Sequence, residues 1–222
     1  MQPVLPRLRL MLAGGGDAPD SVPLDEIFAG WLGQRGRLLY LPLAAAPKTD
    51  GYAQHRAWID AVFAPLGVSV IQMWTDLTAR EPAELEDFGG VYIGGGNTFT
   101  LLHLLRASGF DRALKHFALN GGAVYGGSAG AILLGADIAS CERDDPNTVG
   151  LTDTRGLDLL AGHDLWCHYR PDQQEQVQAY SHHSGRPLYA LPERGGLCAQ
   201  GGVIRSVGFE PCQTFFPSFP SG

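Results

Sequence analysis

Short apolar runs alternate with segments of helical spacing through the first 135 residues of the chain. The apolar runs predict strands at residues 8–13, 38–43, 68–74, 91–93 and 123–125. The spacing between them predicts helices from a cap at Ser21 to residue 32, and at residues 52–66, 98–107, 110–119 and 131–134. Strands that are apolar on both faces and alternate with helices are typical of a parallel sheet covered on both sides. We therefore expect a three-layer α/β sandwich with a mostly parallel, doubly wound sheet, and a site beyond the carboxyl ends of its strands.

The pattern becomes less regular beyond residue 140. A polar loop at residues 142–156 precedes a strand near 165–168, a helix around 172–180 and a strand at 188–191. Residues 197–200 and 203–207 flank two glycines, which predicts a β-hairpin. The tail at 213–222, rich in Phe, Pro and Ser, is expected to lie against the surface. The length suits one domain spanning residues 1–222.

Composition and charge narrow the classes of partner. The formal net charge is −7 and no run of Lys and Arg is present, which argues against nucleic acid. No apolar stretch is long enough for a membrane span, and Arg7 and Arg9 interrupt the first one, unlike a signal peptide. The four cysteines are widely spaced and form no C-x-x-C pair, as in reduced proteins. We expect a cytoplasmic protein without nucleic-acid or membrane partners.

Residues 126–130, Gly-Gly-Ser-Ala-Gly, form a G-x-S-x-G sequence between a predicted strand and a predicted helix. In a nucleophile elbow, a sharp turn lifts the serine hydroxyl above the sheet edge, and small neighbours let strand and helix pass closely. The helix that begins at Ala129 directs free N–H groups at the same point. A glycine-rich turn that only packs, or that holds a phosphate, would have the same five residues. The flanking strand and helix favour Ser128 as a nucleophile.

A serine nucleophile needs a base, and a histidine base needs an acceptor that fixes its tautomer. The downstream histidines are His163, His168, His182 and His183. His168 ends a predicted strand that could bring it to the rim holding Ser128, whereas His163 is expected in a loop. His182 and His183 are expected at a helix end and an exposed turn.

Three carboxylates are candidates for the acceptor. Glu193 follows a predicted strand and is the first choice, and Asp144 and Asp145 in the polar loop are the alternatives.

A second glycine turn follows the fourth predicted strand, at residues 94–99, Gly-Gly-Gly-Asn-Thr-Phe. It lacks the spacing of a dinucleotide loop and the lysine of a P-loop. It could present a backbone N–H to an oxyanion, together with the N–H of Ala129, and Asn97 could cap the following helix. No spacing of His and Cys supports a zinc site, although His163 and His168 lie five residues apart. We expect no metal.

The two glycine segments, residues 94–102 and 127–131, resemble the signature blocks of the aspartyl dipeptidases of peptidase family S51. Residues 40–42, 64–68, 168–169 and 191–193 add to the resemblance, which covers most of the chain. It implies a sandwich fold akin to class I glutamine amidotransferases, which is flavodoxin-like, and a Ser128–His168–Glu193 triad. It also implies an oxyanion hole from the N–H groups of Gly96 and Ala129 and no metal or organic cofactor.

The resemblance further implies a small peptide substrate. Family members cleave Asp-X dipeptides, and related cyanophycinases cut aspartyl-arginine isopeptide bonds. We expect Asn97 and Arg170 to bind substrate, and a monomer or homodimer. Two departures bear on specificity: the chain stops soon after the hairpin, and residues 172–176 are Asp-Gln-Gln-Glu-Gln where basic residues are expected. An aspartyl pocket needs a guanidinium or ammonium group, and Arg170 is the only close candidate in this segment.

Two other functions remain open from the sequence. An α/β-hydrolase esterase shares the G-x-S-x-G turn, but its histidine comes last in the triad, and no histidine follows His183. A relative without Asp-X dipeptidase activity could cleave another peptide or isopeptide, or could bind an acidic amino acid or peptide without catalysis.

Overall fold

The computed structural model describes residues 7–33, 36–45 and 52–217. Its main sheet has seven strands in the order β3-β2-β4-β5-β1-β8-β9. Strands β1 to β5 are parallel to one another. Strand β8 pairs antiparallel with β1, and β9 pairs antiparallel with β8. Their bounds are β1 Arg9–Ala13, β2 Arg37–Leu41, β3 Val70–Met73, β4 Gly90–Ile93, β5 Ala123–Gly127, β8 Gly195–Gln200 and β9 Val203–Gly208. The mostly parallel sheet predicted from the sequence is confirmed.

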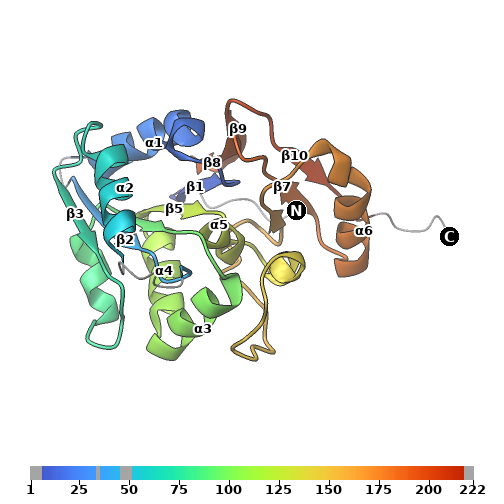
Figure 1. The fold of residues 1–222 in the computed structure, drawn as a ribbon, viewed down its shortest axis with the longest axis horizontal. Helices are drawn as coiled ribbons and strands as arrows, with labels where there is room; N and C mark the ends of the chain where they lie inside the picture. The colour runs from blue at the N-terminus through green and yellow to red at the C-terminus, as the bar shows by residue number, and fades with distance from the viewer. Residues whose placement is uncertain (1–6, 34–35, 46–51, 218–222) are drawn as a thin grey trace.

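Helices cover both faces of this sheet (Figure 1). Alternate residues of the strands supply two apolar clusters, because successive side chains of a strand point to opposite faces. Met11 packs with α1 and α2, whereas Leu10 and Leu12 pack with α3, α4 and α5. These helices are α1 Ala18–Leu32, α2 Ala53–Phe63, α3 Thr98–Ser108, α4 Phe110–Leu119 and α5 Ala129–Leu134.

A second sheet of three strands, in the order β10-β7-β6, lies at the end of the chain coloured orange and red in Figure 1. Its strands are β6 Asp164–Trp166, β7 Leu188–Ala190 and β10 Gln213–Phe215, and α6 Gln174–Ser184 connects β6 to β7. The sequence analysis did not predict β10, which takes up the first residues of the tail and pairs with β7 through three residue pairs. Residues 218–222 of that tail lie outside the described residues.

The first helix also begins earlier than the pattern predicted. It starts at Ala18, three residues before the expected cap at Ser21, and Asp20 accepts a hydrogen bond from the N–H of Asp17. Pro19 fits the first turn because the N–H it lacks would have no helical partner there. Ser21 therefore lies inside α1, and its hydroxyl donates to Asp25 at 2.7 Å. None of the helices in the described ranges is long and apolar enough to cross a membrane.

Candidate active site

Ser128 occupies a strained turn between β5 and α5. Its φ is 49° and its ψ is −109°, a backbone conformation that residues with a side chain rarely adopt. A Cβ on Gly126 would lie 2.5 Å from the carbonyl oxygen of Gly130, and a Cβ on Gly130 would lie 2.2 Å from that of Ile93. The two glycines thus let the helix start directly against the strands. The backbone N–H of Ser128 donates to the carbonyl of Ala13 at 3.1 Å, which ties the turn to β1.

The imidazole of His168 lies directly against this hydroxyl. Its Nε2 is 2.8 Å from the Oγ of Ser128, a normal hydrogen-bond distance. His168 also has a positive φ, 54°, and its backbone N–H donates to the carbonyl of Gly14 at 2.9 Å. Gly15 leaves the space for the ring, since a Cβ there would lie 2.3 Å from Cε1. With the proton on Nδ1, the Nε2 of His168 can accept the proton of Ser128.

The carboxylate of Glu193 lies on the far side of the same ring. Its Oε1 is 3.4 Å from the Nδ1 of His168, and the Glu193 side chain is 62% exposed. The two alternatives have other partners: Asp145 accepts from the N–H and hydroxyl of Thr98, and Asp144 pairs with Arg143 at 2.9 Å. Among the three candidate carboxylates, Glu193 is therefore the one that contacts the histidine.

The other histidines and the cysteine beside the site have different environments. His163 lies in a loop, as expected, but it is buried there and stacks on Tyr189 at 4.5 Å between ring centroids. His182 and His183 lie in the last turn of α6, as expected. Cys167 is buried next to His168, and burial raises the pKa of its thiol to about 12, which disfavours the nucleophilic thiolate.

Two backbone N–H groups near Ser128 have no acceptor among the described residues. They belong to Gly96, in the turn after β4, and to Ala129, the first residue of α5. The turn is fixed on either side of Gly96, because Gly94 donates to Leu41 and Asn97 donates to Ala44. Such N–H groups suit an oxyanion, since they would otherwise need water.

Gly95, in the turn after β4, lies beside Ser128. A Cβ on Gly95 would lie 3.3 Å from the Cβ of Ser128. Its place beside the nucleophile could have been inferred from the rule that parallel strands end at one sheet edge, because it follows β4 just as Ser128 follows β5.

The two residues expected to bind substrate have local structural partners. Asn97 accepts from the N–H of Thr100 at 2.8 Å as the cap of α3, and its amide donates to the carbonyl of Pro146 at 2.9 Å. Arg170 pairs with Asp172 at 3.2 Å, with both side chains largely exposed. Neither residue lines the pocket that opens beside Ser128.

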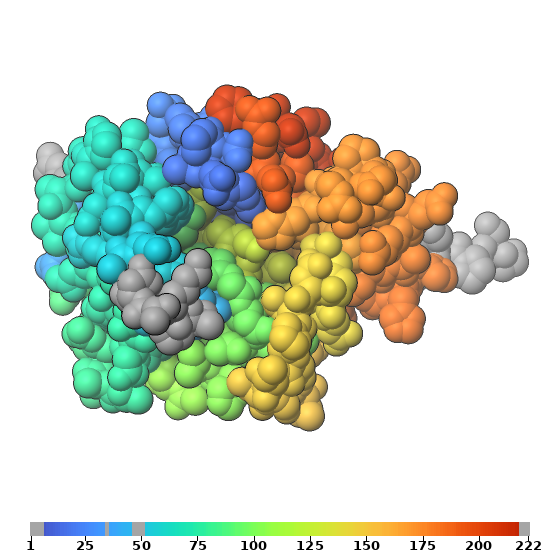
Figure 2. All heavy atoms as spheres, viewed as in Figure 1, coloured from blue at the N-terminus to red at the C-terminus, as the bar shows by residue number. Residues whose placement is uncertain are grey.

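That pocket has a volume of about 290 Å³. It lies at the carboxyl ends of β1, β4 and β5, in the hollow between α1, α2 and the second sheet (Figure 2). Besides Ser128 and His168, its lining comprises Ala13, Gly15, Gly16, Ser21, Tyr40, His55, Trp58, Tyr92, Gly94, Gly95 and Gly127. The sequence analysis did not identify the side chains from α1, β2, α2 and β4. The glycine run at 14–16 was the sequence signal that the end of β1 also lies at the site, because similar runs at 94–96 and 126–127 end β4 and β5.

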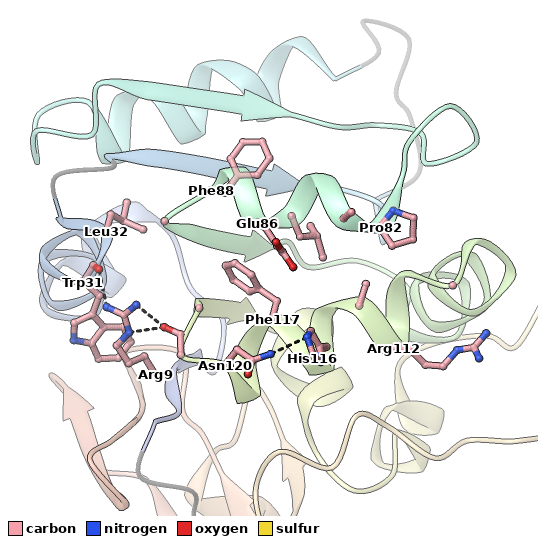
Figure 3. A pocket seen from close by; sticks show the side chains of 17 residues that line it. Arg9, Trp31, Leu32, Pro82, Glu86, Phe88, Arg112, His116, Phe117 and Asn120 are labelled. Carbon is pink, nitrogen blue, oxygen red and sulfur yellow. Dashed lines mark hydrogen bonds between the residues drawn. The ribbon is translucent and has the colours of Figure 1, made fainter.

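A larger cavity, of about 900 Å³, lies at the opposite edge of the sheet (Figure 3). None of the candidate site residues discussed above lines it. Within the described ranges, no three His, Cys, Asp or Glu side chains are grouped so that they could hold a metal ion.

Comparison with known proteins identifies the family. The model of peptidase family S51 matches residues 10–207, which include the turn at Ser128, His168 and Glu193. The chain belongs to peptidase family S51. Peptidase E of Shigella flexneri serotype 5b (strain 8401) is 31% identical over 160 residues, 69% of this chain. That match covers 64% of the length of the Shigella protein.

Two solved structures share the fold of this family S51 chain. A peptidase from an acI-B1 Actinobacterium superposes with a TM-score of 0.70 at 18% identity, over 95% of either chain. A protein of Listeria monocytogenes EGD-e, provisionally named peptidase E, has a TM-score of 0.66 at 20% identity, over 91% of this chain and 99% of its own. The expected glutamine amidotransferase-like α/β fold is thereby confirmed.

Proposed function

We propose that this protein is a serine peptidase that hydrolyses short peptides through an acyl-enzyme. Family membership supports a peptidase, and the 2.8 Å contact between the Oγ of Ser128 and the Nε2 of His168 carries the assignment of these two residues. A serine hydroxyl becomes a useful nucleophile when a neighbouring base removes its proton. The four free thiols support action in the cytoplasm.

The reaction follows from the positions of the groups. His168 takes the proton of Ser128 as the serine oxygen bonds to the carbonyl carbon of the scissile peptide. The N–H groups of Gly96 and Ala129 donate to the resulting oxyanion, and Glu193 stabilises the imidazolium through Nδ1. The imidazolium then protonates the leaving amine as the C–N bond breaks. Water, deprotonated by His168, attacks the acyl-enzyme and releases the acid and free Ser128.

Asp-X dipeptides are the finer hypothesis, and the resemblance to aspartyl dipeptidases is its support. Arg170, which we expected to bind the aspartyl carboxylate, instead pairs with Asp172. A panel of dipeptides that includes the Asp-X series is therefore the first activity assay to run, with short-chain esters beside it to test for an esterase.

A fluorophosphonate probe tests the nucleophile directly. We expect labelling of the folded protein at Ser128, found by peptide mass mapping, and loss of labelling in Ser128→Ala. Ser108→Ala is the matched control, because Ser108 lies on α3 and donates only to backbone carbonyls of its own helix. A folded protein that is not labelled and cleaves no peptide would contradict the proposal and favour a binding protein.

A further inference from the structure

The peptide unit that joins Cys167 to His168 is held at both of its polar atoms. Its N–H donates to the carbonyl oxygen of Gly14 at 2.9 Å, and its carbonyl oxygen accepts from the Nη2 of Arg143 at 2.6 Å. Among the described residues, no other group donates to that carbonyl. Because a peptide unit is planar, bonds on its two opposite sides fix its orientation. The imidazole of His168 is placed relative to this plane by its positive φ of 54°.

The strain at His168 makes the two bonds important. A residue with a side chain rarely adopts a positive φ, and it keeps this conformation only where its surroundings impose it. A hydrogen bond from a charged donor has a free energy comparable to the cost of such a conformation. The bond from Arg143 is therefore strong enough to decide whether the Nε2 of His168 stays 2.8 Å from the Oγ of Ser128.

Arg143 is itself fixed by its neighbours. It ends the short 3-10 helix η3, Ala139–Arg143, and its Cζ lies 4.2 Å from the ring centroid of Trp166, a residue that is 2% exposed. Its guanidinium also pairs with Asp144 at 2.9 Å. A planar guanidinium can stack on a ring and donate within its own plane at the same time, which an ammonium group cannot do.

Arg143 does not line the pocket beside Ser128, so its influence on the reaction passes through the peptide unit before His168. We infer that Arg143 is a positioning residue for the base. By holding the carbonyl of Cys167, it keeps the imidazole of His168 within hydrogen-bond distance of the nucleophile. The inference rests on the proposed function, in which His168 takes the proton of Ser128.

Removal of the donor tests the inference. Arg143→Met deletes the guanidinium and keeps a side chain that can pack on Trp166. We expect kcat to fall about 10- to 100-fold with KM within about twofold of the parent, because the imidazole is misplaced while the pocket is unchanged. The rate at which the fluorophosphonate labels Ser128 should fall by a similar factor. An unchanged kcat would overturn the inference, and so would a raised KM at unchanged kcat, which indicates a contact with substrate.

Arg106→Met is the matched control. Arg106, on α3, also donates to two backbone carbonyls of the polar loop, those of Asp153 and Arg155, but neither adjoins a residue of the site. Urea denaturation gives the loss of stability in both variants, and kcat is compared under conditions in which both are folded. Equal decreases of kcat would overturn the inference, because any weakening of the loop would then suffice.

Amide hydrogen exchange separates this inference from the proposed function. The amide of His168 is protected by its bond to Gly14, and NMR measures its exchange whether or not the protein cleaves a peptide. In Arg143→Met we expect this amide to exchange at least about tenfold faster relative to that of Leu12 in β1, and in Arg106→Met to keep its rate.

The two failures differ in this experiment. Unchanged exchange of the His168 amide in Arg143→Met would overturn the inference even if the parent is an active peptidase. Faster exchange in that variant, with a parent that neither cleaves peptides nor reacts with the fluorophosphonate, would contradict the proposed function and leave the placement of His168 by Arg143 intact.

Discussion

The main sheet has a cavity at the carboxyl ends of its parallel strands (the carboxyl edge) and another at their amino ends (the amino edge). The polar groups of the two cavities are arranged differently. At the carboxyl edge, a pocket of about 290 Å³ holds Ser128 and His168, both in left-handed backbone conformations. At the amino ends of the strands, the cavity in Figure 3 is about three times larger, yet the polar side chains of Arg9, His116 and Asn120 that line it form hydrogen bonds within the protein. Arg9 donates to the carbonyls of Trp31 and Gly121, and His116 bonds to Asn120 at 2.8 Å.

The direction of the chain accounts for this difference. Helices α1 and α4 end at the amino edge, so backbone carbonyls accumulate there and Arg9 satisfies them. Helix α5 begins at the carboxyl edge, where the N–H groups of Gly96 and Ala129 have no acceptor among the described residues. Free backbone donors and strained residues, rather than the volume of a cavity, thus indicate which of the two sites is suited to catalysis.

The largest expected effect comes from removing the base. His168→Ala should lower kcat by at least about 10³-fold, because no other side chain of the described residues forms a hydrogen bond with the hydroxyl of Ser128. His116→Ala, at the amino edge, should stay within about twofold of the parent. Steady-state hydrolysis of the preferred peptide measures both. Comparable losses of kcat in the two variants would contradict the inference that catalysis takes place at the carboxyl edge alone.

A smaller loss is expected from Glu193→Gln. The glutamine can still bond to the Nδ1 of His168 but cannot stabilise the imidazolium by charge. Because Glu193 is 62% exposed and 3.4 Å from Nδ1, we expect a decrease in kcat of about 10- to 100-fold. Glu210→Gln, also exposed, is the control. An unchanged kcat in Glu193→Gln with a large loss in Asp145→Asn would transfer the role to the polar loop.

At the amino edge, Arg9 should matter for stability rather than for catalysis. Arg9→Met leaves the carbonyls of Trp31 and Gly121 without their donor and should lower the free energy of unfolding by about 2 kcal/mol. Urea denaturation measures the loss, and Arg7→Met, exposed at the start of the described chain, is the control. The kcat of the folded fraction should not change. A tenfold fall in kcat would show that the two edges are coupled.

The smallest expected effect depends on pH. Burial of Asp25 in α1, opposed by the hydroxyls of Ser21 and Tyr125, raises its pKa from 3.8 to about 6. The folded state then binds more protons than the unfolded state, so this carboxyl lowers stability as pH rises from about 4 to 6. Asp25→Asn should be more stable than the parent by about 1–2 kcal/mol at pH 8 and equal to it near pH 3.5.

Thermal denaturation across this pH range checks the prediction. Glu175→Gln, exposed on α6 and without influence on the pKa of Asp25, should follow the parent at every pH. An Asp25→Asn variant whose advantage does not change with pH would contradict the raised pKa and point to a packing effect.

The local pattern of apolar and polar residues was sufficient to predict the helices and strands in which buried positions recur regularly. The five parallel strands follow from apolar runs, and the turn that carries Ser128 follows from the glycines that end one of them. The second sheet was missed in part because β10 has only three residues, and the pairing with β7 that defines it is nonlocal. The start of α1 was misplaced because Asp17 and Ser21 are both suitable caps, and Ser21 instead bonds to Asp25 one turn further along the same helix.

Side-chain roles in the site were harder to infer than its position. Asn97 carries the residue type of a substrate ligand and of a helix cap, and its bond to Pro146 depends on where the polar loop folds. His55 and Trp58 belong to no motif, so only the assembled sheet and α2 bring them to Ser128. Sequence reasoning therefore located the reacting groups better than the groups that surround a substrate.

The absence of a side chain at Gly15 has a practical consequence. Because the ring of His168 occupies the place of a Cβ at that position, Gly15→Ala would displace the imidazole while leaving Ser128, His168 and Glu193 unaltered in identity. Such a protein would retain the serine hydroxyl, the glycine turns and the aromatic residues that line the pocket, but it would be catalytically inactive. It would serve as a trap for capturing natural ligands from cell extracts, without the loss of a polar contact that mutation of the serine itself entails.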